Sequence, residues 1–152
     1  MKKLSEVISA DCIVVPMSAT DKQAAIEELV QALCDAGRLT DPKPLLEAVL
    51  AREATRSTGI GQGLAIPHGK CGGLGGLVGA AGKPKMPIDF ESIDGQPVNF
   101  VVLFGSDIDQ TGPHIQALAR LSRLMTTPSF REKISQAKTS EEVYRAFVEH
   151  EN

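Results

Sequence analysis

Three residues, Arg52, His68 and His114, stand at positions where a hydrophobic core does not require them. A neutral imidazole is a good nucleophile near neutral pH, because its pKa lies close to the working range. Phosphoryl transfer to it demands mainly positioning and neutralisation of charged oxygens, which an arginine, backbone N–H groups and a second imidazole would supply. Taken singly, each residue is more often structural, so their types alone leave both interpretations open.

The stretch before and around His68 is rich in glycine and reads GIGQGLAIPHGK over residues 59–70. It does not form a Walker loop, because five residues separate Gly63 from the Gly-Lys pair and Cys71 follows where Ser or Thr is needed. A dinucleotide fingerprint also fails, because leucine holds the place of its last glycine. Whether the glycines bind phosphate therefore stays open, and His68 becomes the candidate residue, with Pro67 restricting the backbone that enters it.

Composition narrows the class of protein. The chain has 152 residues, of which 16 are basic and 19 acidic, and 42% are hydrophobic. We expect a single domain over residues 1–152, with no general attraction to nucleic acid or anionic lipid. No apolar run is long enough to cross a bilayer, and Ser5 and Glu6 interrupt any signal peptide. The sequence thus predicts a cytoplasmic protein that does not insert into membranes.

The three cysteines, Cys12, Cys34 and Cys71, are odd in number and widely spaced, which argues against a disulfide framework. Cys12 and Cys34 lie in apolar segments and are expected to be small core residues. His68 and Cys71 lack two further ligands at supporting spacing, so we expect no metal site. The sequence likewise indicates no cofactor.

Apolar periodicity predicts a strand followed by two helices in the first part of the chain. The strand is expected at residues 12–16, the first helix over about 20–36, and the second helix from Asp41-Pro42 onward with Arg52 and Arg56 near its end. The segment 57–85 is irregular, with short strands expected at 64–67 and 77–81. A candidate strand at 86–90 and a turn at Asp94-Gly95 lead to a buried strand at 99–104.

The last third of the chain is predicted to be helical. A helix opening at His114 is expected to bury one side, a shorter one runs from 128 to about 137, and a capping box at Thr139 starts the last. The buried side of the first of these helices is assigned to Ile115, Leu118, Leu121 and Met125. Strand, two helices, several strands and three helices together predict an α/β fold with a mixed sheet.

On these motifs the chain resembles the fructose- and mannitol-type enzyme IIA domains of the phosphoenolpyruvate-dependent sugar phosphotransferase system. The resemblance spans nearly the whole chain and rests on Arg52-Glu53, on STGIGQGLAIPHGK at 57–70 and on HIQALARL at 114–121. Within that family the chain is most similar to the nitrogen-regulatory branch, because SIDGQPV at 92–98 and DQT at 109–111 are typical of its members.

The resemblance implies a fold and a site. The fold would be a three-layer α/β/α sandwich with a mixed sheet. His68 matches the phosphorylated histidine, His114 the second histidine that contacts the phosphoryl group, and Arg52 the arginine that binds it. Thr58 and Gly59 fall in the adjoining motif and are expected to take part in binding phosphate.

The resemblance also implies partners. The donor would be a phosphorylated HPr-like carrier protein, and the phosphorylation state would regulate a partner such as a kinase or an ion transporter. An alternative is a sugar-transport IIA subunit that passes phosphate to a IIB domain. A second alternative, a binding module that is never phosphorylated, is disfavoured by the intact set of Arg52, His68 and His114.

Overall fold

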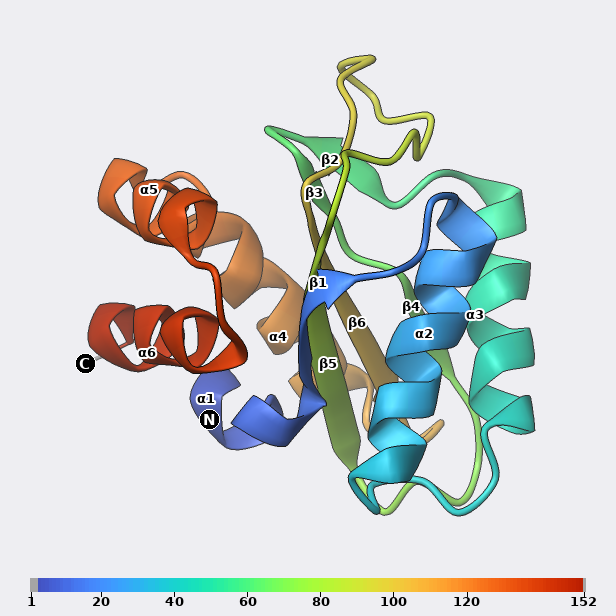
Figure 1. Cartoon of the computed structure of the whole chain (residues 1–152). Coiled ribbons are helices and arrows are strands. Elements are labelled where there is room, and N and C mark those ends of the chain that lie inside the picture. The colour runs from blue at the N-terminus through green and yellow to red at the C-terminus, as the bar shows by residue number, and fades with distance from the viewer. Residues whose placement is uncertain (1–2, 152) are drawn as a thin grey trace.

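The computed structural model describes residues 3–151 and shows a mixed sheet between two layers of helices (Figure 1). Helices α2 and α3 cover one face, and α1, α4, α5 and α6 cover the other. The three-layer α/β/α sandwich expected from the sequence is confirmed. The helices are α1 (Leu4–Val7), α2 (Lys22–Asp35), α3 (Lys43–Thr55), α4 (Thr111–Leu124), α5 (Pro128–Gln136) and α6 (Ser140–His150), with a 3-10 turn at Ala10–Cys12.

The sheet is built around one buried central strand. Its strands are β1 (Ile13–Met17), β2 (Gly59–Gly61), β3 (Leu64–Ala65), β4 (His68–Lys70), β5 (Leu77–Pro84) and β6 (Phe100–Ser106). They run in the order β1-β5-β6-β3-β2, and β4 also pairs with β6. β5 is antiparallel to β6, whereas β3 and β4 are parallel to it at its two ends. Every residue of β6 is buried, as its continuous apolar run predicts.

Alternate residues of β6 serve opposite faces of the sheet, as the two-residue period of a strand requires. Phe100, Val102 and Phe104 pack in the core beneath α4, α5 and α6. Val101 and Leu103 pack in the second core, beneath α2 and α3. No helix within residues 3–151 has both the length and the apolar character needed to span a membrane.

The glycine-rich segment contains two short strands, each parallel to β6, where a single strand was expected at 64–67. β3 ends at Ala65, and the chain pairs with β6 again as β4, with His68 opposite Phe104. Pro67 lies between them and has no N–H to continue a ladder, although its carbonyl accepts the N–H of Phe104 at 3.1 Å. His68 therefore belongs to a strand next to the centre of the sheet rather than to a free loop.

The prediction of a strand at 86–90 is wrong. Only Ile88 pairs there, in an isolated bridge with Val98. Pro87 and Pro97 stand immediately before the two bridged residues, and neither has an N–H to extend the pairing. The turn at Asp94-Gly95 is present, with φ of 73° at the glycine.

The inner face of α4 also differs from the expectation. The helix begins at Thr111, and its buried residues are His114, Ala117 and Leu121. Ile115 is 58% exposed, so its assignment to the buried side is wrong. The apolar pattern places His114 on the polar side of the helix. Its hydrogen bond to the sheet allows the ring to be buried, so the inner face of the helix includes His114.

Candidate active site

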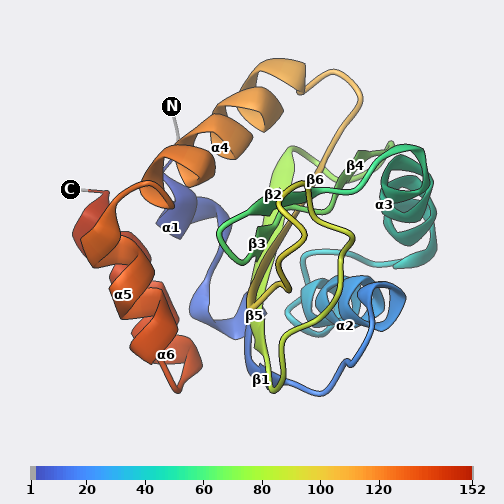
Figure 2. The same cartoon turned by 90° about the horizontal axis from the view of Figure 1, so that it is seen from above.

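The fold brings Arg52, His68 and His114 together from three different elements. Arg52 lies in the last turn of α3, His68 begins β4, and His114 lies in the first turns of α4. Figure 2 shows β4 between α3 and α4, close to where the chain leaves β6 for α4. The rings of His68 and His114 meet edge to face, with centroids 5.3 Å apart and planes at 67°.

A pocket of about 230 Å³ opens at His68. Its charged lining comes from Arg52 and Arg56, and its rim is largely apolar. The remaining lining residues are Ser57, Thr58, Ile60, Ile66, Ile93, Leu118 and Ser122. A small basic pocket beside an imidazole suits an anionic group attached to that imidazole.

The hydrogen bonding of His68 determines which ring nitrogen is available. Its Nδ1 lies 2.7 Å from the carbonyl oxygen of Ile66. A carbonyl oxygen only accepts, so Nδ1 carries the hydrogen and donates it, and Nε2 is left with a free lone pair. Burial lowers the pKa of His68, and the charges of Arg52 and Lys70 act in the same direction. The neutral form of the ring is therefore favoured at pH 7.

His114 is also neutral, but it is held by the sheet. It is 3% exposed, and its Nδ1 lies 2.7 Å from the hydroxyl oxygen of Ser106. Burial lowers the pKa of His114 to about 4, with further lowering from His68 and Lys70. The Nζ of Lys70 donates to the hydroxyl of Thr111 at 2.8 Å, which ties the start of α4 to β4.

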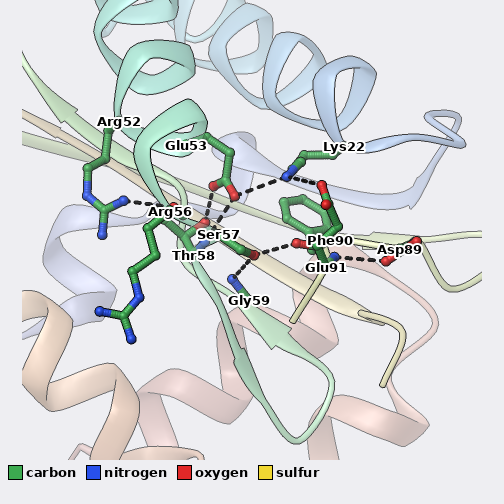
Figure 3. Close-up of polar contacts among 10 residues, drawn as sticks. All are labelled: Lys22, Arg52, Glu53, Arg56, Ser57, Thr58, Gly59, Asp89, Phe90 and Glu91. Atoms are coloured by element: carbon green, nitrogen blue, oxygen red, sulfur yellow. Dashed lines mark hydrogen bonds and ion pairs between the residues drawn. The ribbon is translucent and has the colours of Figure 1, made fainter. Parts of the chain in front are cut away.

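Arg52 is oriented by the end of its own helix. Its Nη1 donates to the carbonyl oxygen of Arg56 at 2.8 Å (Figure 3). A guanidinium has five N–H groups, and no ion pair engages this one within residues 3–151. Most of its donors are thus free for an anionic ligand.

Glu53, next to Arg52, is buried and anchors the loop beneath the pocket (Figure 3). Its carboxylate accepts the N–H of Thr58 at 3.0 Å and also the Thr58 hydroxyl. It pairs with Lys22 at 3.4 Å, and Lys22 pairs in turn with Glu91 at 3.2 Å. The sequence predicts no role for Glu53 beyond its place in the Arg52-Glu53 motif.

A sequence signal for the burial of Glu53 did exist. The buried residues of α3 are Leu45, Val49 and Glu53, which follow one another at intervals of four. That spacing places the carboxylate on the inner stripe of the helix. A buried carboxylate requires donors, and the polar residues of the adjoining loop, such as Thr58, are within reach.

Thr58 and Gly59, predicted to bind phosphate, lie beside the pocket with their N–H groups already engaged. Thr58 donates both its N–H and its hydroxyl to Glu53. Gly59 donates its N–H to the Ser57 hydroxyl at 3.0 Å. A Cβ at position 59 would collide with the side chain of Ser92, so this glycine allows the close approach of β2 and the segment that holds Ser92.

The chain matches one protein family over nearly its whole length. Residues 6–150 match the family described as "Phosphoenolpyruvate-dependent sugar phosphotransferase system, EIIA 2". The nitrogen regulatory protein of Bradyrhizobium diazoefficiens is 32% identical over 143 residues, which cover 93% of this chain and 92% of that protein. The fructose-specific EIIABC component of Bacillus subtilis is 33% identical over 98% of this chain, but the chain spans only 24% of that longer protein.

Solved structures show the same likeness. The nitrogen regulatory protein IIA-Ntr from Neisseria meningitidis superposes with a TM-score of 0.84 at 31% identity, covering 95% of this chain and 98% of that one. IIA mannitol from Escherichia coli superposes with a TM-score of 0.76 at 20% identity, covering 91% of this chain and 97% of that one, which shows the shared fold. The chain therefore belongs to the EIIA 2 family of the phosphoenolpyruvate-dependent sugar phosphotransferase system.

Proposed function

We propose that this protein is a phosphocarrier that accepts a phosphoryl group on Nε2 of His68 from a phosphorylated HPr-like protein in the cytoplasm. Membership of the EIIA 2 family supports a transferase role in general. The observation that carries the residue assignment is the bond from Nδ1 of His68 to the Ile66 carbonyl at 2.7 Å. It leaves Nε2 unprotonated in a pocket that also holds Arg52.

The transfer step exchanges one nitrogen–phosphorus bond for another. The lone pair of His68 Nε2 attacks phosphorus, the nitrogen–phosphorus bond of the donor phosphohistidine breaks, and the donor imidazole retains that electron pair. His68 still carries the hydrogen on Nδ1, so its ring gains positive charge. The Ile66 carbonyl stabilises that charge through a stronger hydrogen bond.

The charge of the phosphoryl oxygens is met by two groups. Arg52 offers its free N–H groups, and His114 offers an imidazole whose ring lies 5.3 Å from that of His68. Direct contact of Thr58 or Gly59 with the phosphoryl group would require exchange of their present hydrogen bonds. Their contribution to phosphate binding is therefore proposed to be the shape of the loop that closes the pocket.

The experiment that tests this function is incubation with phosphoenolpyruvate, enzyme I and an HPr-type carrier, followed by intact mass spectrometry. One acid-labile phosphate is expected on the wild-type protein and none on His68→Ala. His150→Ala is the matched control, because His150 bonds to Ser129 in a different part of the molecule. A phosphate that persists on His68→Ala would refute the assignment of the nucleophile.

Two uses of the phosphorylated protein are consistent with its relatives. The match to nitrogen regulatory proteins over more than 90% of both chains favours regulation of a partner, such as a kinase or an ion transporter. The likeness to a fructose-specific EIIABC component and to the IIA of a mannitol complex with phosphorylated IIB supports transfer to a IIB domain.

The charge that phosphorylation adds can distinguish the two uses. Phosphorylation adds about two negative charges to a half-buried pocket, which changes the surfaces that can pack against it. A regulatory protein should therefore bind different partners in its two states. Pull-downs from lysate with phosphorylated protein and with His68→Ala should recover different sets; identical sets, together with transfer to a IIB domain, would support the transport role.

A further inference from the structure

Ser106 is a buried polar residue that no motif of the sequence singles out. It is the last residue of the central strand β6 and is 0% exposed. Its carbonyl accepts the N–H of Cys71 at 3.1 Å, and it is paired in register with Lys70 on one side and Leu77 on the other. Its hydroxyl is therefore held at a fixed place in the sheet, 2.7 Å from Nδ1 of His114.

The direction of the hydrogen bond follows from satisfying both groups. His114 is neutral at pH 7 because burial lowers its pKa to about 4, so its ring has one N–H. Within residues 3–151 the Ser106 hydroxyl has no hydrogen-bond partner other than His114. If Nδ1 were the donor, the hydroxyl hydrogen would be buried without an acceptor, whereas donation by Ser106 satisfies both groups.

The opposite nitrogen of His114, Nε2, is not fully buried. Among residues 3–151, Nε2 of His114 has no protein partner, yet it is not one of the buried unpartnered side-chain atoms, which are Ser92 Oγ and Arg120 Nε. When Ser106 donates to Nδ1, the ring hydrogen resides on Nε2. His114 then presents a hydrogen, while His68 presents a lone pair.

We propose that Ser106 is a positioning residue that fixes His114 in its Nε2–H tautomer and so makes it a hydrogen-bond donor to a phosphoryl group on His68. The inference rests on the proposed function. The other tautomer would present a lone pair to the anionic oxygens and repel them. Two hydrogen bonds, one from His68 Nδ1 to the Ile66 carbonyl and one from the Ser106 hydroxyl to His114 Nδ1, thus select opposite tautomers in two neighbouring rings.

The first test needs no phosphate. Long-range proton–nitrogen NMR correlations of the unphosphorylated protein distinguish a protonated ring nitrogen from an unprotonated one. In the wild type, His114 is expected to be protonated at Nε2 only, and in Ser106→Ala it is expected to become a mixture of tautomers. Protonation at Nδ1 in the wild type, or an unchanged pattern in Ser106→Ala, would overturn the proposal.

Ser129→Ala is the matched control for this measurement. Ser129 is the hydroxyl partner of His150, at 3.2 Å from its Nε2, in an exposed pair outside the site. Loss of that hydroxyl should change the His150 signals and leave those of His114 unchanged. Ser106→Cys keeps a side chain of similar size with a weak donor, and is expected to hold the Nε2–H tautomer only in part.

The second test is kinetic and uses a double-mutant cycle. Ser106→Ala should slow phosphoryl transfer through His68 by roughly tenfold, with Ser106→Cys between it and the wild type. In a His114→Ala background, Ser106→Ala should have no further effect, because Ser106 acts only through His114. Equal slowing in both backgrounds would show a merely structural role. If the wild type takes up no phosphate, the proposed function fails while the NMR result still decides the tautomer.

Discussion

Gly69 of β4 lies against the backbone of α3 so closely that a Cβ on it would sit 2.9 Å from the carbonyl carbon of Ala48 and 2.8 Å from the amide nitrogen of Val49. Its register partner on β6, Gly105, allows the same approach, since a Cβ there would sit 2.6 Å from Cδ1 of Leu45. The paired glycines let α3 pack directly on the sheet, and this brings Arg52 beside the residue that precedes Gly69.

Replacement of Gly69 by alanine should therefore disturb both stability and function. The added methyl group meets backbone atoms, which cannot move aside as a side-chain end could, so α3 must shift. We expect a loss of about 1–3 kcal/mol in the free energy of unfolding. Phosphoryl uptake should slow as well, because Arg52 moves with the helix. Urea unfolding and a transfer assay measure the two effects.

Gly72→Ala is the control for that variant. Gly72 follows β4 closely in the chain, and a Cβ there meets nothing within 4 Å. Its stability and transfer rate should stay near those of the wild type. Equal behaviour of the two variants would contradict the role of Gly69 in helix packing.

A second prediction concerns the buried carboxylate of Glu53. Glu53→Gln keeps the size of the side chain but removes the charge that pairs with Lys22, and it places an amide near the donors of Thr58. We expect a loss of about 2 kcal/mol in the free energy of unfolding. Glu91→Gln, at the exposed end of the same network, should cost less than about 1 kcal/mol. Similar losses in urea unfolding of both variants would argue against the anchoring role.

A third prediction separates the charge of Arg52 from the stability of the fold. Arg52→Ala should leave the unfolding midpoint almost unchanged, because among the described residues its side chain bonds only to the Arg56 carbonyl. Phosphoryl transfer should slow by about tenfold to a hundredfold, the effect of a lost hydrogen bond to a charged group. Arg52→Lys should recover part of the rate, since a lysine supplies charge without the planar fork. A wild-type rate in Arg52→Ala would refute the assigned role.

The pH dependence of stability follows from the lowered pKa of His114. The folded-state pKa of about 4 lies below the ordinary value of 6.5, so between these values the unfolded state binds more protons. Stability should fall as the pH drops through that window, by an amount on the order of 3 kcal/mol from this group. Burial lowers the pKa of His68 in the same direction.

Urea unfolding at pH 7 and pH 4.5 tests this expectation when wild type and His114→Ala are compared, because carboxylate contributions are common to both. The wild-type protein should lose more stability on acidification than the variant. An equal loss of stability on acidification in the two proteins would show that burial of His114 does not cause the pH dependence.

Most of the framework could be predicted from the sequence because local patterns specify it. The apolar run at 99–104 predicts a buried strand, and β6 occupies Phe100–Ser106. Helical spacing predicts the first long helix over about 20–36, and α2 runs over Lys22–Asp35. The structure also brings Arg52, His68 and His114 close together, as their common assignment to a phosphate site requires.

The remaining features depend on contacts between distant segments. β4 has only three residues and pairs because β6 is already in place, so no periodicity reveals it. The inner face of α4 contains His114 rather than Ile115, because the hydroxyl of Ser106 supplies a hydrogen-bond partner for the buried ring. A serine at the end of an apolar strand gives no local sign of such a partner. The tautomer of His114 could therefore be inferred only from the structure.

NMR of the phosphorylated, nitrogen-15-labelled protein can show whether Nε2 of His68 carries the phosphoryl group. We expect phosphorus–nitrogen coupling at Nε2 of His68, with the hydrogen retained on Nδ1 and bonded to the Ile66 carbonyl. Phosphorus coupled to Nδ1 of His68, or to a nitrogen of His114 or His150, would contradict it.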